Sequence, residues 1–411
     1  MKSERSPVRS RPWPPPHAPG FRTRRAIRRS VPDHTVSHPG SAIGGAAAEG
    51  AYELGRIQGL DLLRGLAIFL VLIRHSWPGT FGGAGIVGVV IFFALSGYLI
   101  TGLLVKDLQH FGRVRWGRFY FHRAVRLLPA LYVLLAVYVL VNMTWNWLGE
   151  TTDQTVWGVI TGVTYTANMP YLTKGAALGH LWTLATEEQF YLLWPLLLGL
   201  GFRYRKVRIA AVIAIVVVFA GLIWQLWWRS DNVAAIYTMP FSFSPAIVLG
   251  SVARLGKARL QRILPPAGVA RAALSTLAIG ILFALCLLPE VKQYPVMYVL
   301  GGPLIAVCTI VLVLHVEHWR TLPRVFAPML WLGTISYAAY LWNYPIMRWV
   351  LHEYGPRHPW WPWLTILYTL AAATASWFLI EKPLQRWRRR VDARHAERKA
   401  PAPVGRHAVA G

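Results

Sequence analysis

Few residues of this chain carry a charge, and few of the charged residues are acidic. Charged residues make up 15% of its 411 residues, and Lys and Arg outnumber Asp and Glu by 43 to 17. Hydrophobic residues make up 55%, which excludes an ordinary soluble domain and predicts a polytopic membrane protein. The net charge of +26 would suggest nucleic-acid binding in a soluble protein. Here the cations gather in tails and loops, as the positive-inside rule requires, so no nucleic-acid partner is expected.

Cysteine is almost absent. Cys286 and Cys308 both lie in apolar runs and are expected to be small buried hydrophobes. Two cysteines form neither a disulfide framework nor a zinc site, and we expect no metal. Internal repeats are absent too, which argues against the two-half architecture of many secondary transporters. No apolar run lies near enough to the N-terminus to make a signal peptide.

Ten apolar runs are long enough to span a bilayer. They are Leu60–Trp77, Gly85–Val105, Ala124–Trp147, Gln189–Phe202, Val207–Trp228, Ala234–Ala253, Ala267–Leu288, Pro295–Val316, Phe326–Val350 and Trp360–Ile380. A shorter run, Val156–Tyr171, is interrupted by polar residues. If that run does not span and the N-terminus is inside, the basic connections all fall on the cytoplasmic side. The sequence therefore predicts an all-α polytopic protein of the inner (cytoplasmic) membrane, with about ten transmembrane helices and cytoplasmic N and C termini.

Three regions follow from this pattern. Residues 1–55 are expected to be a disordered basic cytoplasmic tail. Residues 56–385 are the predicted membrane domain, with an outer loop at 151–180 that could re-enter the bilayer against protein or water. Residues 386–411 are a second basic cytoplasmic tail. The lipid bilayer is one partner, and no appended soluble domain is expected.

The run Gly59–Trp77 carries ionisable side chains near both ends. Read as a helix, it places Arg64 and His75 within about 20° of each other and about 16 Å apart along the axis. Asp61 lies on the same face. Ionisable side chains in apolar spans are costly and normally face a protein interior or a wet cavity. We therefore predict that this face lines an active site.

Polar groups recur in later apolar runs, where they need one another as hydrogen-bonding partners. Arg123 and Arg126 lie three residues apart, either as snorkelling anchors or as a phosphate-binding fork. Glu187 and Glu188 start an aromatic run, where capping with help from Thr186 is the structural alternative. The remaining members of this group are Trp182, Tyr191, Ser336, Tyr337, Asn343 and Glu381. Their convergence predicts a shared internal cavity.

Small residues in the second run have a packing explanation. Ser96 and Gly97 interrupt an otherwise apolar helix. Gly and Ser in membrane helices usually let two backbones approach closely. We therefore expect close helix packing here in preference to a substrate contact.

Together these residues form an ordered set of motifs. In chain order the set is Asp61-x-x-Arg64-Gly65-x-Ala67 with His75, Phe92 to Ile100, Arg123-x-x-Arg126-x-x-Pro129, Leu181 to Tyr191, Ile335 to Tyr337 with Tyr340 to Trp342, and Glu381-x-Pro383. The set resembles the acyltransferase-3 family of integral membrane O-acyltransferases, over about Gly59 to Leu384. One position departs from the family pattern, because Asn343 stands where histidine often follows Tyr-Leu-Trp.

The resemblance implies transfer of an acyl group from cytoplasmic acyl-CoA, with acetyl-CoA the expected donor. The acceptor would be a hydroxyl of a glycan, a lipid-linked sugar or a small glycosylated or polyketide molecule. It implies that His75 is the base, that Arg64, with Asp61, is its essential neighbour, and that Arg123 and Arg126 lie on the CoA side. A neutral histidine could take the hydroxyl proton during attack on the thioester, and Arg64 or a nearby donor could stabilise the oxyanion.

Two other classes of function stay open at this point. Intramembrane His, Arg and Glu also build proton relays, so a proton-coupled transporter or permease is the main alternative. A haem-binding electron carrier that uses His75 with His180 or His315 is the third. The sequence leaves open the acceptor, the acyl chain length, the oligomeric state, the side of acylation and the depth of His75.

Overall fold

The computed structural model describes residues 57–146, 148–169, 172 and 177–399, and within them every regular element is a helix. The predicted all-α class is therefore confirmed. The predicted tail at 1–55 and the last residues, 400–411, lie outside the described residues. Residues 386–399, predicted as tail, belong to helix α15 (Lys382–Lys399).

Six helices of the described chain are long and apolar enough to cross a membrane. They are α3 (Ala84–Phe111), α4 (Trp116–Trp145), α7 (Val207–Trp228), α10 (Val269–Cys286), η4 with α11 (Met297–Val316), and the continuous helix of α14 (Trp361–Ser376), η6 (Trp377–Glu381) and α15 up to Arg394. A seventh forms if α12 (Ala327–Thr334) and α13 (Ser336–Tyr354), which are bent by 67°, are one span. The chain is thus a multi-pass membrane protein.

The predicted number of ten spans is higher than this count. Helix α2 (Gln58–Ser76) is long enough to cross, but its 19 residues include Asp61, Arg64 and Arg74. Helix α8 (Ser244–Leu255) has 12 residues, because part of the predicted run forms the short helix η2 (Val233–Thr238) instead. Ten spans and cytoplasmic termini stay predictions.

The remaining helices are shorter or more polar. They are α5 (Thr152–Val163), η1 (Gly179–Leu181), α6 (Trp182–Arg203), α9 (Lys257–Ile263), η3 (Val291–Gln293) and η5 (Arg324–Phe326). Helix α5 occupies the predicted outer loop and packs against α4. It begins with a capping box in which the Thr151 and Gln154 side chains each accept from the other residue's backbone N–H. A re-entrant path for this loop stays a prediction.

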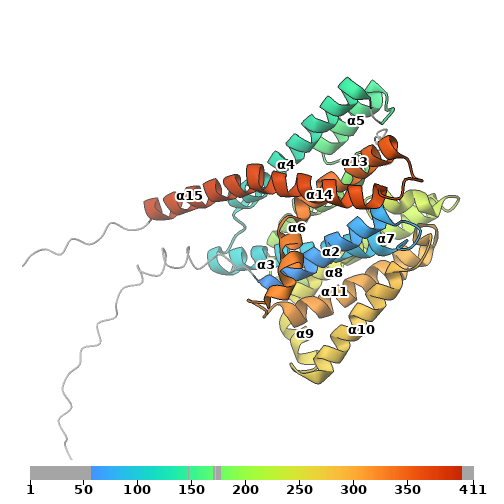
Figure 1. Ribbon diagram of the computed structural model, residues 1–411. Coiled ribbons are helices and arrows are strands. Elements are labelled where there is room, and N and C mark those ends of the chain that lie inside the picture. The colour runs from blue at the N-terminus through green and yellow to red at the C-terminus, as the bar shows by residue number, and fades with distance from the viewer. Residues whose placement is uncertain (1–56, 147, 170–171, 173–176, 400–411) are drawn as a thin grey trace, which may run out of the picture.

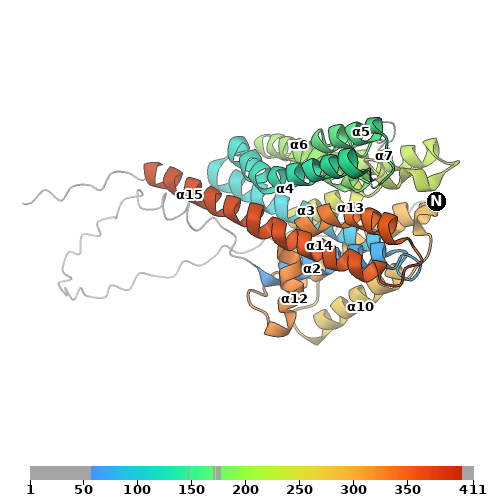
Figure 2. The same ribbon diagram turned by 45° about the horizontal axis from the view of Figure 1, so that its top comes forward.

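Helix α3 lies at the centre of the bundle and packs on α2, α8 and α11. Figure 2 shows α4 to α7 on one side of it and α10 and α12 on the other. Figure 1 shows α15 projecting from one end of the bundle, the end at which α2 begins. The outer helices leave large apolar side chains exposed, including Val216 of α7 and Leu277 of α10, as lipid-facing surfaces require.

Glycines make the central packing close. A Cβ at Gly97 of α3 would collide with the Ile247 carbonyl group of α8, and one at Gly250 of α8 would collide with Ala94 of α3. The packing role predicted for Gly97 is therefore confirmed. The neighbouring Ser96 hydroxyl hydrogen-bonds the Tyr191 hydroxyl of α6, so the two predicted packing residues hold α3 to different helices.

Replacing Gly97 by alanine is expected to destabilise the bundle by about 1–3 kcal/mol, because overpacking forces two helices apart. Tryptophan fluorescence during thermal unfolding in detergent would measure the loss as a lower Tm. The matched control is Gly280→Ala in α10, where a Cβ meets open space. An equal Tm for both variants would contradict the close-packing interpretation.

Candidate active site

Helix α2 carries its ionisable residues to opposite ends of the bundle. Asp61 lies in its first turn and His75 in its last. Two groups of polar side chains from other helices gather around these ends. The Arg64 cluster comprises Asp61, Arg64, Arg123, Arg126, Glu187, Glu188, Tyr191, Ser336, Tyr337 and Glu381, and the His75 cluster comprises His75, His180, Thr183, Tyr340, Asn343, Tyr344 and Thr369.

The His75 imidazole is held by an amide on a facing helix. Its Nδ1 hydrogen-bonds Oδ1 of Asn343 in α13, and the Asn343 Nδ2 donates to Oγ1 of Thr369 in α14 at 3.3 Å. Because the Asn343 oxygen can only accept, the proton of a neutral His75 lies on Nδ1. Nε2 then carries the lone pair. Asn343 thus fixes both the orientation of the ring and its tautomer.

His180 lies beside His75. The rings of His75 and His180 both pack against Tyr344, with centroids 5.3 and 5.5 Å from it. His180 Nε2 lies 3.1 Å from the Leu341 carbonyl oxygen, and the His180 carbonyl accepts from the Tyr340 hydroxyl at 2.7 Å. These contacts tie η1 to α13 and hold the wall of the site in place.

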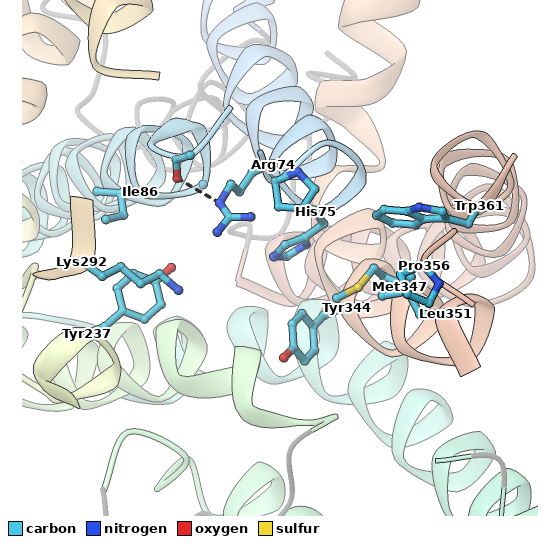
Figure 3. A pocket seen from close by; sticks show the side chains of 13 residues that line it. Arg74, His75, Ile86, Tyr237, Lys292, Tyr344, Met347, Leu351, Pro356 and Trp361 are labelled. Carbon is cyan, nitrogen blue, oxygen red and sulfur yellow. Dashed lines mark hydrogen bonds between the residues drawn. The ribbon is translucent and has the colours of Figure 1, made fainter. Parts of the chain in front are cut away.

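A cavity of about 380 Å³ opens at His75. Figure 3 shows the imidazole between Arg74 and Trp361, with Tyr344 below it in this view. The remaining residues that line it include Tyr237, Ile86, Met347, Leu351 and Lys292. A cavity of this size with aromatic walls and few charged groups is typical of a small-molecule site.

Arg64 lies at the other end of α2 and does not line this cavity. Its Nη2 donates to Oγ of Ser336 at 2.8 Å, and its Nη1 lies 4.0 Å from Oδ1 of Asp61. The charges of Arg126, Glu187 and Glu381 also act on it. Predicted residues from four elements therefore meet around Arg64, beside the start of α13. These elements are α2, α4, α6 and η6.

Arg123 and Arg126 differ in their surroundings. Arg123 forms an ion pair with Glu188, and its guanidinium lies 3.5 Å from the centroid of the Tyr191 ring. Arg126 is exposed and makes no hydrogen bond or ion pair with the residues that the structure describes. Of the two arginines predicted to bind phosphate, Arg123 is thus paired with a carboxylate, and Arg126 keeps its charge available for a ligand.

Three expectations change in detail. Glu187 and Glu188 do not start their helix, because α6 begins at Trp182 and the Thr186 hydroxyl donates to the Trp182 carbonyl at 3.0 Å instead of capping. The predicted run Phe326–Val350 breaks at Ile335. Trp182, predicted as a member of the polar group, belongs to an aromatic core. Its ring centroid lies 6.0 Å from that of Phe93 and 5.1 Å from that of Tyr237.

The other predicted polar residues also have defined partners. The Tyr337 hydroxyl donates to the Leu127 carbonyl of α4 at 2.8 Å. Glu381 is buried, with its charge close to those of Arg126 and Arg64. His315 packs on Trp319, whose carbonyl oxygen accepts from the Gly59 N–H at the start of α2. His315 is thus at the opposite end from His75, and of the two histidines considered as haem partners, His180 is the one near His75.

Sequence reasoning missed two cations of the cavity. Arg74 precedes His75 directly, and Lys292 lies in η3, between α10 and α11. Burial and the charge of Arg74 lower the pKa of Lys292 to about 8. Arg74 could have been suspected from its position beside His75. No sequence pattern points to Lys292, because it lies more than 200 residues after His75 in the chain.

Comparisons with known proteins identify relatives of this chain. A family model described as "Acyltransferase domain" matches residues 57–381. YrhL of Bacillus subtilis, provisionally named a peptidoglycan O-acetyltransferase, is 30% identical over 363 residues, 80% of this chain and 55% of that protein. The peptidoglycan O-acetyltransferase OatA of Listeria monocytogenes is 28% identical over 358 residues, 80% of this chain and 56% of that protein.

A third relative, the O-acetyltransferase OatA of Staphylococcus aureus, is 28% identical over 355 residues, 80% of this chain and 57% of that protein. The chain spans about half the length of the curated relatives it matches. No solved structure matches it significantly. The family model covers both polar clusters and most of the described helices. The chain therefore belongs to the acyltransferase-3 family of integral membrane O-acyltransferases.

Proposed function

We propose that this protein transfers an acyl group from acyl-CoA to a hydroxyl of a glycan, with acetyl-CoA as the donor. The observation that carries the proposal is the placement of His75. Asn343 holds its Nδ1, and the ring lines a cavity of about 380 Å³. Nε2 is therefore the nitrogen left to accept a proton. The names of the relatives point to a cell-envelope glycan as the first acceptor class to try.

The chemistry follows from this geometry. Nε2 of His75 takes the proton of the acceptor hydroxyl while the oxygen attacks the thioester carbonyl carbon. A new C–O bond forms, the C–S bond breaks, and the protonated His75 gives its proton to the CoA thiolate. Asn343 keeps Nδ1–H hydrogen-bonded throughout, so the ring stays oriented as its charge changes. The products are the O-acyl ester and CoA with a free thiol.

In this proposal the Arg64 cluster lies at the end of the bundle that binds the donor, acyl-CoA. It lies at the end where α2 begins, which the distribution of basic loops assigns to the cytoplasm. Arg126 supplies an available cation for the CoA phosphates. The extended pantetheine arm then carries the thioester along α2, over the axial distance of about 16 Å that separates Arg64 from His75. Arg64, held by Ser336, acts on the donor at this end and does not reach the oxyanion at His75.

Arg126→Ala is expected to raise the KM for acetyl-CoA about tenfold, the cost of one lost charge-assisted contact to phosphate. The kcat should change less, because His75 is untouched. Steady-state thiol release at varied acetyl-CoA separates the two constants. Arg113→Ala is the matched control, since Arg113 is an exposed arginine in the loop between α3 and α4. Equal KM values for both variants would remove Arg126 from the donor site.

The function itself is tested with the full chain in lipid nanodiscs. Purified protein receives acetyl-CoA with or without an isolated envelope glycan, and both free thiol and glycan acetyl ester are measured. We expect thiol release that requires the glycan and equals the ester formed. Acetyl-CoA binding without ester formation on glycans or on small hydroxyl acceptors would overturn the proposal. The absence of both acetyl-CoA binding and ester formation would favour the transporter alternative.

A further inference from the structure

We propose that the cavity at His75 selects an anionic acceptor, a sugar whose carboxylate or phosphate binds between Arg74 and Lys292. A neighbouring hydroxyl of the same sugar would then lie at His75. The acylation of that hydroxyl rests on the function proposed above, whereas binding of the anion does not. Figure 3 shows the Arg74 guanidinium, the Lys292 side chain and the His75 ring approaching one open space.

Arg74 is fixed in position yet keeps donors for a ligand. Its Nε donates to the Gly82 carbonyl oxygen at 2.9 Å, and its side-chain stem lies against the backbone at Gly85. Within the described chain, its two terminal nitrogens have no hydrogen-bond or ion-pair partner. A guanidinium anchored at Nε presents its terminal nitrogens as a planar pair, which suits the oxygens of a carboxylate or phosphate.

Lys292 is held on the opposite wall. Its Nζ lies 3.7 Å from the centroid of the Tyr237 ring, and its carbonyl oxygen accepts from the Tyr298 hydroxyl at 2.8 Å. Among the described residues no carboxylate lies within ion-pair distance of it. The nearest acid in sequence, Glu290, is exposed and accepts from the Gln293 amide at 2.5 Å.

Two cations that face one cavity repel each other, which favours the neutral form of Lys292. Burial and the charge of Arg74 lower its pKa to about 8. An anion between the two side chains would remove the repulsion and form charge-assisted hydrogen bonds with both. Aromatic side chains from three further elements, Tyr237, Tyr344 and Trp361, complete the walls. The site therefore combines a place for one negative charge with flat apolar faces for a sugar ring.

The test compares three sugars with a common core. N-acetylglucosamine is neutral, N-acetylmuramic acid adds a carboxylate, and N-acetylglucosamine 1-phosphate adds a phosphate. Affinities are measured by saturation-transfer NMR with the full chain in nanodiscs made of zwitterionic lipid. We expect both anionic sugars to bind about tenfold more tightly than the neutral one. A preference for only one of them would identify the acceptor anion as carboxylate or phosphate.

Variants assign the preference to the two side chains. Lys292→Gln and Arg74→Gln should each reduce the preference for anionic sugars to about threefold or less. The control, Arg229→Gln, removes a cation from the end of α7, outside the cavity. It should leave the preference unchanged. Equal affinities for all three sugars in the wild type, or no detectable binding of any, would overturn the proposal. So would a preference that survives Lys292→Gln.

The preference should also weaken as the pH rises from 7 to 9. Lys292, with a pKa of about 8, loses its charge over this interval. The other groups that face it are Arg74, Glu290, Tyr237 and His75. Burial raises the pKa of Tyr237 to about 12, so this side chain stays neutral over the interval. Lys292→Arg should keep the preference at pH 9, which separates Lys292 from His75. A preference equally lost in Lys292→Arg would contradict this role.

These measurements separate two kinds of failure. If the anionic sugars bind preferentially but wild-type protein releases no thiol from acetyl-CoA with any of them, the anion site stands and the transferase proposal falls. If thiol release occurs equally with the neutral and anionic sugars, the transferase stands and the anion site falls. Each proposal therefore has its own decisive measurement.

Discussion

His75→Gln is expected to lower kcat for acyl transfer about 10²–10⁴-fold, the usual contribution of a positioned general base. Glutamine keeps the polar character and approximate length of the side chain, and its amide can still contact Asn343. It cannot take the proton of the acceptor hydroxyl. Thiol release and ester formation in nanodiscs, measured at saturating acetyl-CoA and glycan, would record the loss.

The matched control for this variant is His352→Gln, because His352 lies in the last turn of the same helix as Asn343 and is exposed. It should retain wild-type kcat. Thermal unfolding of His75→Gln, followed by tryptophan fluorescence, shows whether the bundle is intact. A well-folded His75→Gln protein with more than about a tenth of wild-type kcat would remove His75 from the role of base.

Asn343→Leu is expected to lower kcat about 10–100-fold with little change in either KM, by analogy with the loss of a partner that orients a metal-bound histidine. Leucine has the same heavy-atom branching as asparagine but cannot accept from Nδ1–H. The imidazole then loses both its fixed orientation and its preference for the tautomer with Nε2 free. Steady-state kinetics with acetyl-CoA and glycan varied separately would resolve kcat from KM.

Two further variants distinguish positioning from packing. Asn343→Asp keeps an acceptor oxygen at the same place and should recover most of the kcat that Asn343→Leu loses. Thr369→Val removes the acceptor of the Asn343 amide hydrogen bond and should cost less than about tenfold, because one hydrogen bond to a neutral group contributes about 1 kcal/mol. If the Asp and Leu variants are equally slow, Asn343 acts through packing alone.

Much of the candidate site could be predicted from the sequence. An ionisable side chain in an apolar run is costly, so Asp61, Arg64, His75 and the glutamates stood out without any structure. Helical periodicity placed Arg64 and His75 on one face and at opposite ends. The small residues around Gly97 indicated close packing, and the structure confirms it.

Element boundaries were harder to predict, because apolar composition alone does not mark where a helix bends or begins. The break at Ile335 interrupts a run that the sequence predicted as one continuous span. Helix α6 begins at Trp182, several residues before the predicted start, because the polar residue Thr186 is buried inside the helix packing and donates to the Trp182 carbonyl. Burial against other helices decides such positions, and a single sequence does not record it.

The sequence by itself determined the helical membrane class, the family and the residues able to carry acid, base or phosphate chemistry, because each depends on residue type and local spacing. Tertiary structure decided which of them meet. It pairs Arg123 with Glu188 and leaves Arg126 available, it sets Asn343 against His75, and it brings Lys292 across the bundle to face Arg74. These contacts join residues 65 to more than 200 positions apart. They depend on how the helices pack in three dimensions, which no local pattern in the chain encodes.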